Sequence, residues 1–252
     1  RATGKRLDYM ILLSEAVKAS VLDAGLVPEK RTKVINLGLD FNRFNPDVVS
    51  GDRLRKLWGA APSTIGIGSV GRLTPELGHD VLIKAAASLM KYSEEWKMKF
   101  IVVGEDRITP ADDYIKELQD LVKLFGLEDA VVFETLSDNL PEVMAAFDIF
   151  VMSGREDVPG LGALEALAMR RPVVLSKLIG AEEIVGRKRF GLLVRPEDAF
   201  DLQLKVLTLL QTPEERSEMG VQGRQHVLRF FDKNTRFMRT LDVYERCIKR
   251  RV

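Results

Sequence analysis

One stretch, residues 153–168, combines the residue types that could bind a phosphorylated ligand. It follows the apolar run 147–152, which predicts a buried strand. Pro159 and Gly160 are expected to interrupt regular secondary structure, and a short helix is expected to begin near Gly162. The first N–H groups of a helix have no intrahelical partners, and the helix dipole is positive there. The stretch therefore predicts a phosphate-binding turn.

Two carboxylates flank this turn: Asp157 precedes it, and Glu165 lies within the helix. Glu165 has apolar neighbours, and a carboxylate in such surroundings needs a partner or a ligand. Glu156 is an alternative to Asp157, but the spacing to Glu165 favours Asp157. An anion pocket between carboxylates suits a ligand with both phosphates and hydroxyl groups, such as a nucleotide sugar. The competing interpretation is a solvated loop at an ordinary turn, because acids and glycines cluster in many surface loops.

Composition narrows the class of protein. The chain has 252 residues, of which 46% are hydrophobic and 30% charged, and its net charge is +1. These values are typical of a globular protein and give no argument for nucleic acid as a partner. Cys247 is the sole cysteine and fits a reducing compartment. His79 and His226 lie far apart in the sequence, so we expect no metal site and favour structural roles for both.

No apolar run reaches the length of a membrane span, and no signal peptide opens the sequence, so we expect a cytoplasmic protein. The basic ending, residues 249–251, leaves peripheral attachment to the inner membrane face as an alternative. The first residues include no initiator methionine, which suggests a fragment or a processed form.

Val- and Ile-rich runs alternate with helical segments along most of the chain. Strands are predicted at 8–13, 33–37, 65–70, 98–103, 130–133, 147–152, 172–175 and 191–194. Helices are predicted at 15–24, 79–92, 111–125 and 140–146, within the central stretch, at 182–185, and from 199 onwards. This alternation predicts an α/β fold with a doubly wound parallel sheet and a partial N-terminal β-α-β piece. Ligands bind such sheets at the carboxyl ends of the strands, which is where the loops 68–78 and 153–164 begin.

Five segments, in order, resemble a known family: 71–76, 102–105, 140–143, 153–165 and 172–174. The set is similar to the donor-binding half of retaining glycosyltransferases with the GT-B fold, the group 1 sugar transferases. Segments 14–17 and 34–46 resemble the end of the N-terminal domain and the interdomain linker of such proteins. The resemblance implies a Rossmann-like donor-binding domain at 47–235, a remnant of the N-terminal domain with its linker at 1–46, and a crossing helix at 236–252.

The resemblance also implies roles for individual residues. Arg72 would hold the diphosphate, Asp157 would face the sugar, and Glu165 would accept hydrogen bonds from the ribose. Phosphate and sugar oxygens would be bound by backbone N–H groups around Gly160, Leu161 and Gly162, with Gly71 and Leu136 completing the donor-binding set. The donor, a nucleotide diphosphate sugar, is a substrate, and no cofactor is implied. The acceptor would be a sugar or a lipid-linked sugar, and a missing N-terminal half would supply its site.

Some positions depart from the family pattern. Leu77 stands where a lysine is usual, so one cation for the diphosphate is missing. Asp157 replaces a glutamate, Pro159 an aromatic residue, and Arg170-Arg171 a glycine. Arg155, Arg170 and Lys177 are the alternatives for a replacement cation. The departures leave open a non-catalytic module that binds a sugar nucleotide or a partner, and, less favoured, a sugar-nucleotide epimerase.

Overall fold

The computed structural model describes residues 7–105, 111–135, 139–157, 160–186 and 189–249. Its larger part is built on a parallel six-stranded sheet with strand order β5-β4-β3-β6-β7-β8. The order reverses direction at β3, which pairs with both β4 and β6. The strands are β3 (Ile65–Arg72), β4 (Met98–Glu105), β5 (Val131–Thr135), β6 (Ile149–Met152), β7 (Val173–Ser176) and β8 (Gly191–Val194). The predicted doubly wound parallel sheet is thus confirmed.

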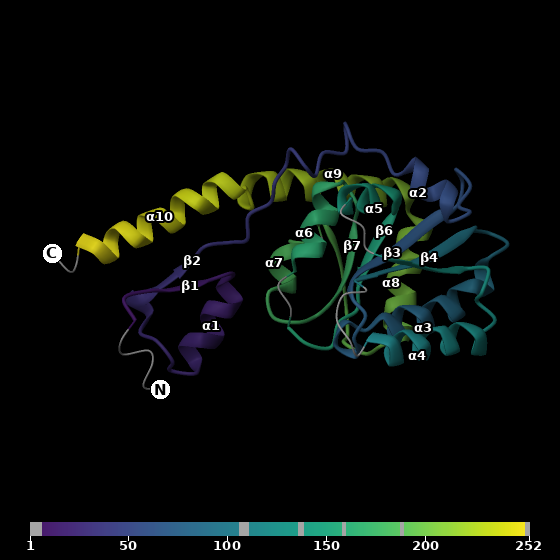
Figure 1. Cartoon of the computed structure of the whole chain (residues 1–252), viewed down its shortest axis with the longest axis horizontal. Coiled ribbons are helices and arrows are strands. Elements are labelled where there is room, and N and C mark those ends of the chain that lie inside the picture. Colours follow the sequence, from purple (N-terminus) through teal and green to yellow (C-terminus); the bar gives the residue numbers. More distant parts are fainter. Residues whose placement is uncertain (1–6, 106–110, 136–138, 158–159, 187–188, 250–252) are drawn as a thin grey trace.

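Helices cover both faces of this sheet, and each face has its own hydrophobic core (Figure 1). One core joins the sheet to α3 (His79–Leu89), α4 (Ala111–Leu124) and α8 (Ala199–Gln211). The other joins it to α2 (Asp52–Leu57), α5 (Leu140–Ala146), α6 (Leu161–Ala168), α7 (Ala181–Val185) and α9 (Pro213–Phe230). Burial on both faces explains why the strands are continuous apolar runs.

The first part of the chain forms a separate small unit. β1 (Met10–Leu12) and β2 (Thr32–Val34) pair in parallel, and α1 (Glu15–Asp23) connects them. Ser14 caps α1, because its Oγ accepts a hydrogen bond from the Val17 N–H at 3.1 Å. Both strands are shorter than predicted, since each has only one neighbour in the described part of the chain.

Two segments cross between the small unit and the large domain, and they are paired with each other. The Leu39 N–H donates to the Phe231 carbonyl at 2.7 Å, and the Lys233 N–H donates to the Leu39 carbonyl at 3.2 Å. Beyond this point, α10 (Lys233–Lys249) extends away from the six-stranded domain toward the side that carries β1 and β2 (Figure 1).

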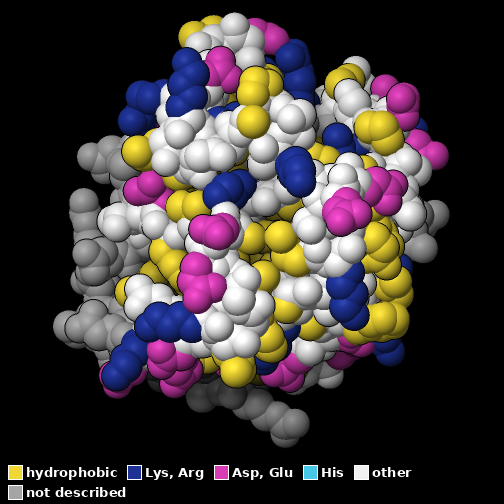
Figure 2. All heavy atoms as spheres, turned by 90° about the vertical axis from the view of Figure 1, so that its right-hand side faces the viewer, with side chains coloured by type: hydrophobic (Ala, Val, Ile, Leu, Met, Phe, Trp, Pro, Cys, Tyr) yellow, Lys and Arg dark blue, Asp and Glu magenta, His cyan; other side chains and the backbone are white. Residues whose placement is uncertain are grey.

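The surface shows no single dominant charge on the face opposite the small unit. Basic and acidic side chains are interspersed there, with hydrophobic side chains exposed between them (Figure 2). This mixture agrees with the small net charge of +1. Over the described ranges, none of the helices combines the length and hydrophobicity that crossing a bilayer requires.

Candidate functional site

The two loops that the sequence singled out lie against each other at the carboxyl ends of β3 and β6. Gly78 has φ +68°, and a Cβ at this position would collide with the Ser153 carbonyl, so only glycine lets the loops approach this closely. The Ser153 Oγ donates to the Gly78 carbonyl at 2.7 Å. The Arg155 N–H donates to the Glu76 carbonyl at 2.8 Å. The structure therefore brings together the loops that carry Arg72 and Asp157.

A buried ion pair holds this junction. The Arg155 guanidinium donates to both carboxylate oxygens of Asp80, at 2.8 Å each, and also to the Pro75 carbonyl. Tyr114 and Lys84 complete the shell, donating to Asp80 at 3.1 Å and 2.8 Å. Burial alone would raise the pKa of Asp80, but the hydrogen bonds from Arg155 and Lys84 outweigh it and hold this pKa well below its ordinary value.

His79 lies beneath the same loop and is 1% exposed. Its Nδ1 is 3.2 Å from the Ser69 Oγ, and its Nε2 is 3.1 Å from the Arg72 carbonyl. Burial lowers the pKa of His79 to about 4, so the ring is neutral at pH 7. A neutral ring that donates from Nε2 and accepts at Nδ1 satisfies both contacts. His79 therefore fixes the backbone at Arg72, in agreement with the structural role expected for it.

Glu165 lies on α6 and is only 9% exposed, as its apolar neighbours predicted. In the described part of the chain it forms no hydrogen bond or ion pair. Burial raises its pKa to about 7, and the more distant charge of Arg43 opposes that shift. Burying a carboxylate without a bonded partner costs free energy. Such a group is a candidate for binding a ligand.

α6 begins one residue earlier than expected, at Leu161, and Gly160 occupies its N-cap position without a capping side chain. Its first N–H groups therefore have no side-chain acceptor from the cap. Leu161 is exposed, whereas Gly162 packs against the Phe150 ring, 3.3 Å from where a Cβ would lie. This geometry suits the predicted contact between backbone amides and phosphate.

Arg72 ends β3 with an exposed side chain and makes no ion pair with a described carboxylate. Next to it, the Leu77 side chain covers Gly71, so closely that a Cβ on Gly71 would overlap the Leu77 Cδ1. The position of the expected lysine is thus filled by an apolar side chain packed on the loop. Leu136, which the resemblance assigns to the donor-binding set, lies outside the described residues.

Each of the three alternatives for a replacement cation has an acidic partner. Arg155 binds Asp80, as described above. Lys177 lies 3.1 Å from Glu182, and Arg170 lies 2.8 Å from Asp47. The Arg155 guanidinium is engaged with Asp80 and joins the two loops. Arg170 and Lys177 form exposed pairs, and neither contacts the phosphate-binding turn in the described residues.

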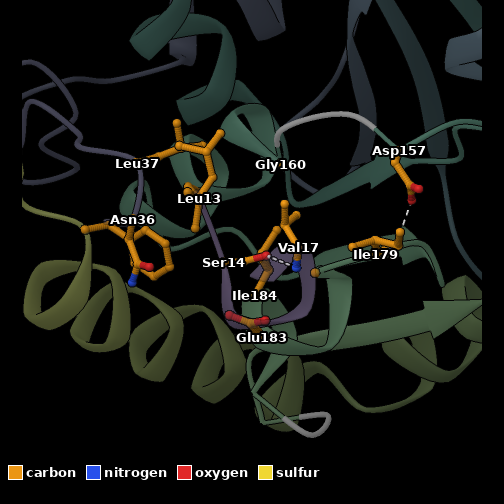
Figure 3. Close-up of a pocket in the computed structure, with 13 residues that line it drawn as sticks. Leu13, Ser14, Val17, Asn36, Leu37, Asp157, Gly160, Ile179, Glu183 and Ile184 are labelled. Atoms are coloured by element: carbon orange, nitrogen blue, oxygen red, sulfur yellow. Dashed lines mark hydrogen bonds between the residues drawn. The ribbon is translucent and has the colours of Figure 1, made fainter. Parts of the chain in front are cut away.

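A cavity of about 360 Å³ opens beside this turn, between the small N-terminal unit and the large domain (Figure 3). From the small unit and the linker it is lined by Leu13, Ser14, Val17, Asn36 and Leu37. From the large domain it is lined by Asp157, Gly160, Leu164, Ile179, Gly180, Glu183, Ile184 and Phe231. Asp157 is oriented by Ile179, whose N–H donates to the Asp157 Oδ1 at 2.7 Å. Arg72, Glu165 and Gly162 do not line this cavity.

Sequence reasoning missed Asp80 and Glu183. Glu183 joins the two parts of the protein, because its carboxylate accepts hydrogen bonds from the N–H groups of Ala16 at 2.7 Å and Glu15 at 3.2 Å. These are the first N–H groups of α1, which favour an anionic partner. An acidic side chain in a short helix gave no signal for a contact so distant in sequence.

Replacing Glu183 with alanine is expected to loosen the small unit. Loss of a carboxylate cap on two helix N–H groups should lower its local stability by about 1–2 kcal/mol. Hydrogen exchange at Glu15 and Ala16 should then accelerate about fivefold or more. The control is Glu182→Ala, which removes only an exposed pair with Lys177. Equal acceleration in both variants would contradict the role given to Glu183.

Comparison with known proteins now places this geometry in a family. The family model described as "Glycosyl transferases group 1" matches residues 64–212. The chain is 32% identical over 245 residues to a D-inositol 3-phosphate glycosyltransferase 2 of Catenulispora acidiphila, covering 94% of this chain and 54% of that protein. It is 30% identical over 203 residues to a mannosylfructose-phosphate synthase of Agrobacterium fabrum, covering 79% and 44%. The chain thus spans about half the length of these curated relatives.

Solved structures agree. Anabaena Alr3699/HepE in complex with UDP and glucose is 26% identical, with a TM-score of 0.85 over 96% of this chain and 64% of that one. The C-terminal domain of LpcC, a glycosyl transferase group 1 family protein from Francisella tularensis, is 28% identical, with a TM-score of 0.69 over 78% of this chain and 100% of that one. The fold and the resemblance inferred from sequence are both confirmed: the chain belongs to the group 1 family of glycosyl transferases and has the Rossmann-like sheet of the GT-B fold.

Proposed function

We propose that this chain is the donor-binding part of a retaining glycosyltransferase that transfers a hexosyl group from a nucleotide diphosphate sugar. The observation that carries the proposal is Glu165, a buried carboxylate without a bonded partner, on the helix that begins at the phosphate-binding turn. A ribose supplies two adjacent hydroxyl donors, which would satisfy this carboxylate. Alr3699/HepE, a structural relative, binds UDP, and this supports a nucleotide as the ligand.

The other roles follow from position. Arg72, exposed at the end of β3, holds the diphosphate, and the N–H groups at Gly160, Leu161 and Gly162 bind phosphate and sugar oxygens. Gly71 has no side chain, so it leaves room for the ligand beside the end of β3. Asp157, held by the Ile179 N–H, faces the sugar. The departing nucleotide diphosphate carries the charge that develops in the reaction, so its stabilisation is the main catalytic task.

The acceptor, a sugar or a lipid-linked sugar, binds to an N-terminal half that this chain mostly lacks. Two exposed features support such a partner. The small β1–β2 sheet has two unpaired edges among the described residues. The exposed face of α10 carries an apolar stripe at helical spacing, formed by Phe237, Leu241, Tyr244 and Ile248. We place the protein in the cytoplasm, with attachment to the inner membrane face where the acceptor is lipid-linked.

Calorimetric titration with UDP, GDP and ADP tests the proposal. One of the three should bind at micromolar to millimolar concentration and release heat, and its affinity should fall when Arg72 is replaced by glutamine. The control Arg239→Gln alters an exposed arginine on α10 and should leave the affinity unchanged. Absence of binding by all three nucleotides would refute a nucleotide-binding function.

The alternative is a module that binds a sugar nucleotide without turnover. It is favoured by Leu77, which fills the lysine position with an apolar side chain packed on Gly71. Without this lysine the diphosphate has one fewer cation.

Leu77→Lys is expected to restore that cation. A charged contact to the departing diphosphate is worth about 2–4 kcal/mol of transition-state stabilisation, so transfer should rise by about 30-fold or more. The assay supplies a complementing N-terminal half from a relative, and Leu77→Met serves as the size-matched control. A large gain with lysine alone supports a weakened active site. High activity in the unaltered chain rules out the non-catalytic module, whereas inactivity of the lysine variant supports it.

A further inference from the structure

A second cavity, of about 350 Å³, lies at the amino ends of β6 and β7, opposite the end of the sheet that carries the proposed donor site. It is formed where the chain leaves α6 and enters β7, and where α9 begins. Its lining residues are Pro46, Asp148, Met169, Arg170, Arg171, Pro172, Pro213, Arg216, Ser217 and Val221. Pro172 directly precedes β7, a strand of 4 residues, so the cavity lies about 13 Å from the carboxyl end of the sheet.

The lining carries more positive than negative charge. Among the described residues, the guanidinium groups of Arg171 and Arg216 donate only to backbone carbonyls, those of Ala145 at 2.8 Å and Leu209 at 3.0 Å. Neither forms an ion pair with a carboxylate of the described residues. Arg170 adds a third guanidinium, which Asp47 pairs at the surface.

Asp148, the one carboxylate among the lining residues, already has an ion-pair partner and a backbone hydrogen-bond donor. Its Oδ2 accepts from the Arg55 Nη1 at 2.8 Å and from the Gly66 N–H at 2.7 Å. It therefore cannot neutralise the guanidiniums of Arg171 and Arg216 as well as it neutralises Arg55.

One of the lining arginines, Arg171, has a buried donor without an acceptor. The Nε of Arg171 is buried and has no hydrogen-bond partner among the described residues. Such a donor costs free energy unless a ligand or a water accepts its hydrogen bond. Burial also lowers the pKa of Arg171 from its ordinary value, and the nearby charge of Asp148 opposes this shift only in part.

The N-terminus of α9 adds a third favourable element. This helix has 18 residues, and its N-cap, Thr212, makes no side-chain capping bond. Its first turn, with Pro213, Arg216 and Ser217, lines the cavity. The first turn also carries Glu214 and Glu215, which are not among the lining residues and offset part of the helix dipole, so the arginines supply most of the positive charge. The carbonyl end of α6, which would repel an anion, is covered, because Arg224 donates to the Ala168 carbonyl.

We propose that this cavity is a second ligand site, which binds the phosphate group of a small phosphorylated molecule through Arg171, Arg216 and the N-terminus of α9. The volume exceeds that of a phosphate ion and leaves room for an organic group. α6 links this site to the donor site, since its first turn lies beside the donor and its last turn lies beside the arginines. The proposal does not depend on the identity of the donor.

Binding of inorganic phosphate and of glucose 6-phosphate, measured by calorimetry at low ionic strength, tests the proposal. Both should bind, and glucose 6-phosphate at least as tightly as phosphate. Arg216→Gln should weaken both by about tenfold, the effect of one charged hydrogen bond. Arg239→Gln removes an equal charge from α10 and should change nothing. Saturation with the nucleotide that fills the donor site should not displace either probe.

Ser217→Glu is a second variant that does not disturb a buried contact, because Ser217 is exposed. It places a carboxylate in the cavity and should abolish binding, whereas the size-matched Ser217→Gln should retain most of it. The proposal is overturned if neither probe binds at millimolar concentration, if phosphate binds but glucose 6-phosphate does not, or if Arg216→Gln and Ser217→Glu bind like the unaltered chain. Displacement of the probes by the nucleotide would place them in the donor site and overturn it equally.

Discussion

Glu165→Met is expected to make the protein more stable at neutral pH while removing most of its affinity for a nucleotide sugar. Glu165 has a pKa of about 7 in the folded protein, compared with an ordinary value of 4.5. Between these values the folded state holds a proton that the unfolded state has lost, so stability falls as the pH rises from about 4.5 to 7. A shift of this size corresponds to about 3 kcal/mol.

Urea unfolding of both proteins at several pH values provides the measurement. The stability difference between Glu165→Met and the unaltered chain should grow by about 3 kcal/mol from pH 4.5 to pH 8, because methionine cannot ionise. Methionine fills a similar volume, so no large cavity opens. A stability difference that does not vary with pH would mean that the pKa of Glu165 is not raised by burial.

The same variant tests the ribose contact. Two hydrogen bonds to a carboxylate are worth about 3 kcal/mol or more together, so affinity for the nucleotide sugar should fall about 100-fold. Glu165→Gln keeps one acceptor and should lose less. In the unaltered chain, affinity should rise with pH up to about 7, since the ionised carboxylate is the better acceptor. A nucleotide sugar is the suitable probe because its diphosphate loses no proton in this range. Unchanged affinity in both variants would remove Glu165 from the site.

Arg155→Met is expected to be among the most destabilising single substitutions in the domain. It leaves Asp80, which is 7% exposed, without its bidentate partner. Breaking a buried ion pair from one side costs about 3–5 kcal/mol, and the remaining bonds from Lys84 and Tyr114 reduce this to about 2–4 kcal/mol. Nucleotide affinity should also fall, because the loops of Arg72 and Asp157 lose the side-chain part of their connection and keep only the bonds at Gly78 and Glu76.

Glu197→Gln is the matched control. Glu197 also accepts a hydrogen bond from Arg155, at 2.7 Å, but its side chain is 64% exposed. Its loss should cost about 0.5 kcal/mol or less. The double variant Asp80→Asn with Arg155→Met should be less destabilised than the sum of the two single variants. Equal costs for Arg155→Met and Glu197→Gln would show that the buried part of the network contributes nothing beyond its exposed part.

Much of the fold could be predicted from sequence because local patterns determine it. β8 (191–194) and α5 (140–146) coincide with their predicted ranges, the latter because Pro141 fits the first turn of a helix. The predicted strand at 147–152 begins only at Ile149. The residue before it, Asp148, is instead turned toward Arg55 and the Gly66 N–H.

The contacts of the candidate site were harder to predict from sequence, for a physical reason. The apolar neighbours of Glu165 predicted a carboxylate that needs a partner or a ligand, because the neighbours along a helix are a local property of the sequence. The partner of Arg155 is 75 residues away in sequence, and nothing in the local pattern of either residue selects the other. A charged residue in a loop has many possible partners, and only the folded chain chooses among them. The roles of Arg72, Asp157 and the Gly160 turn therefore stay predictions until a nucleotide is bound.

The paired crossing at Leu39 and Phe231 has a mechanical consequence. The linker connects the two parts covalently, and the hydrogen bonds of Leu39 to Phe231 and Lys233 attach it to the beginning of α10, so the small unit should bend about this crossing more easily than it twists. Opening of the cavity is thereby expected to follow mainly one hinge motion. Glu183, on the large domain, would then meet the N–H groups of Glu15 and Ala16 in the same alignment at every closure.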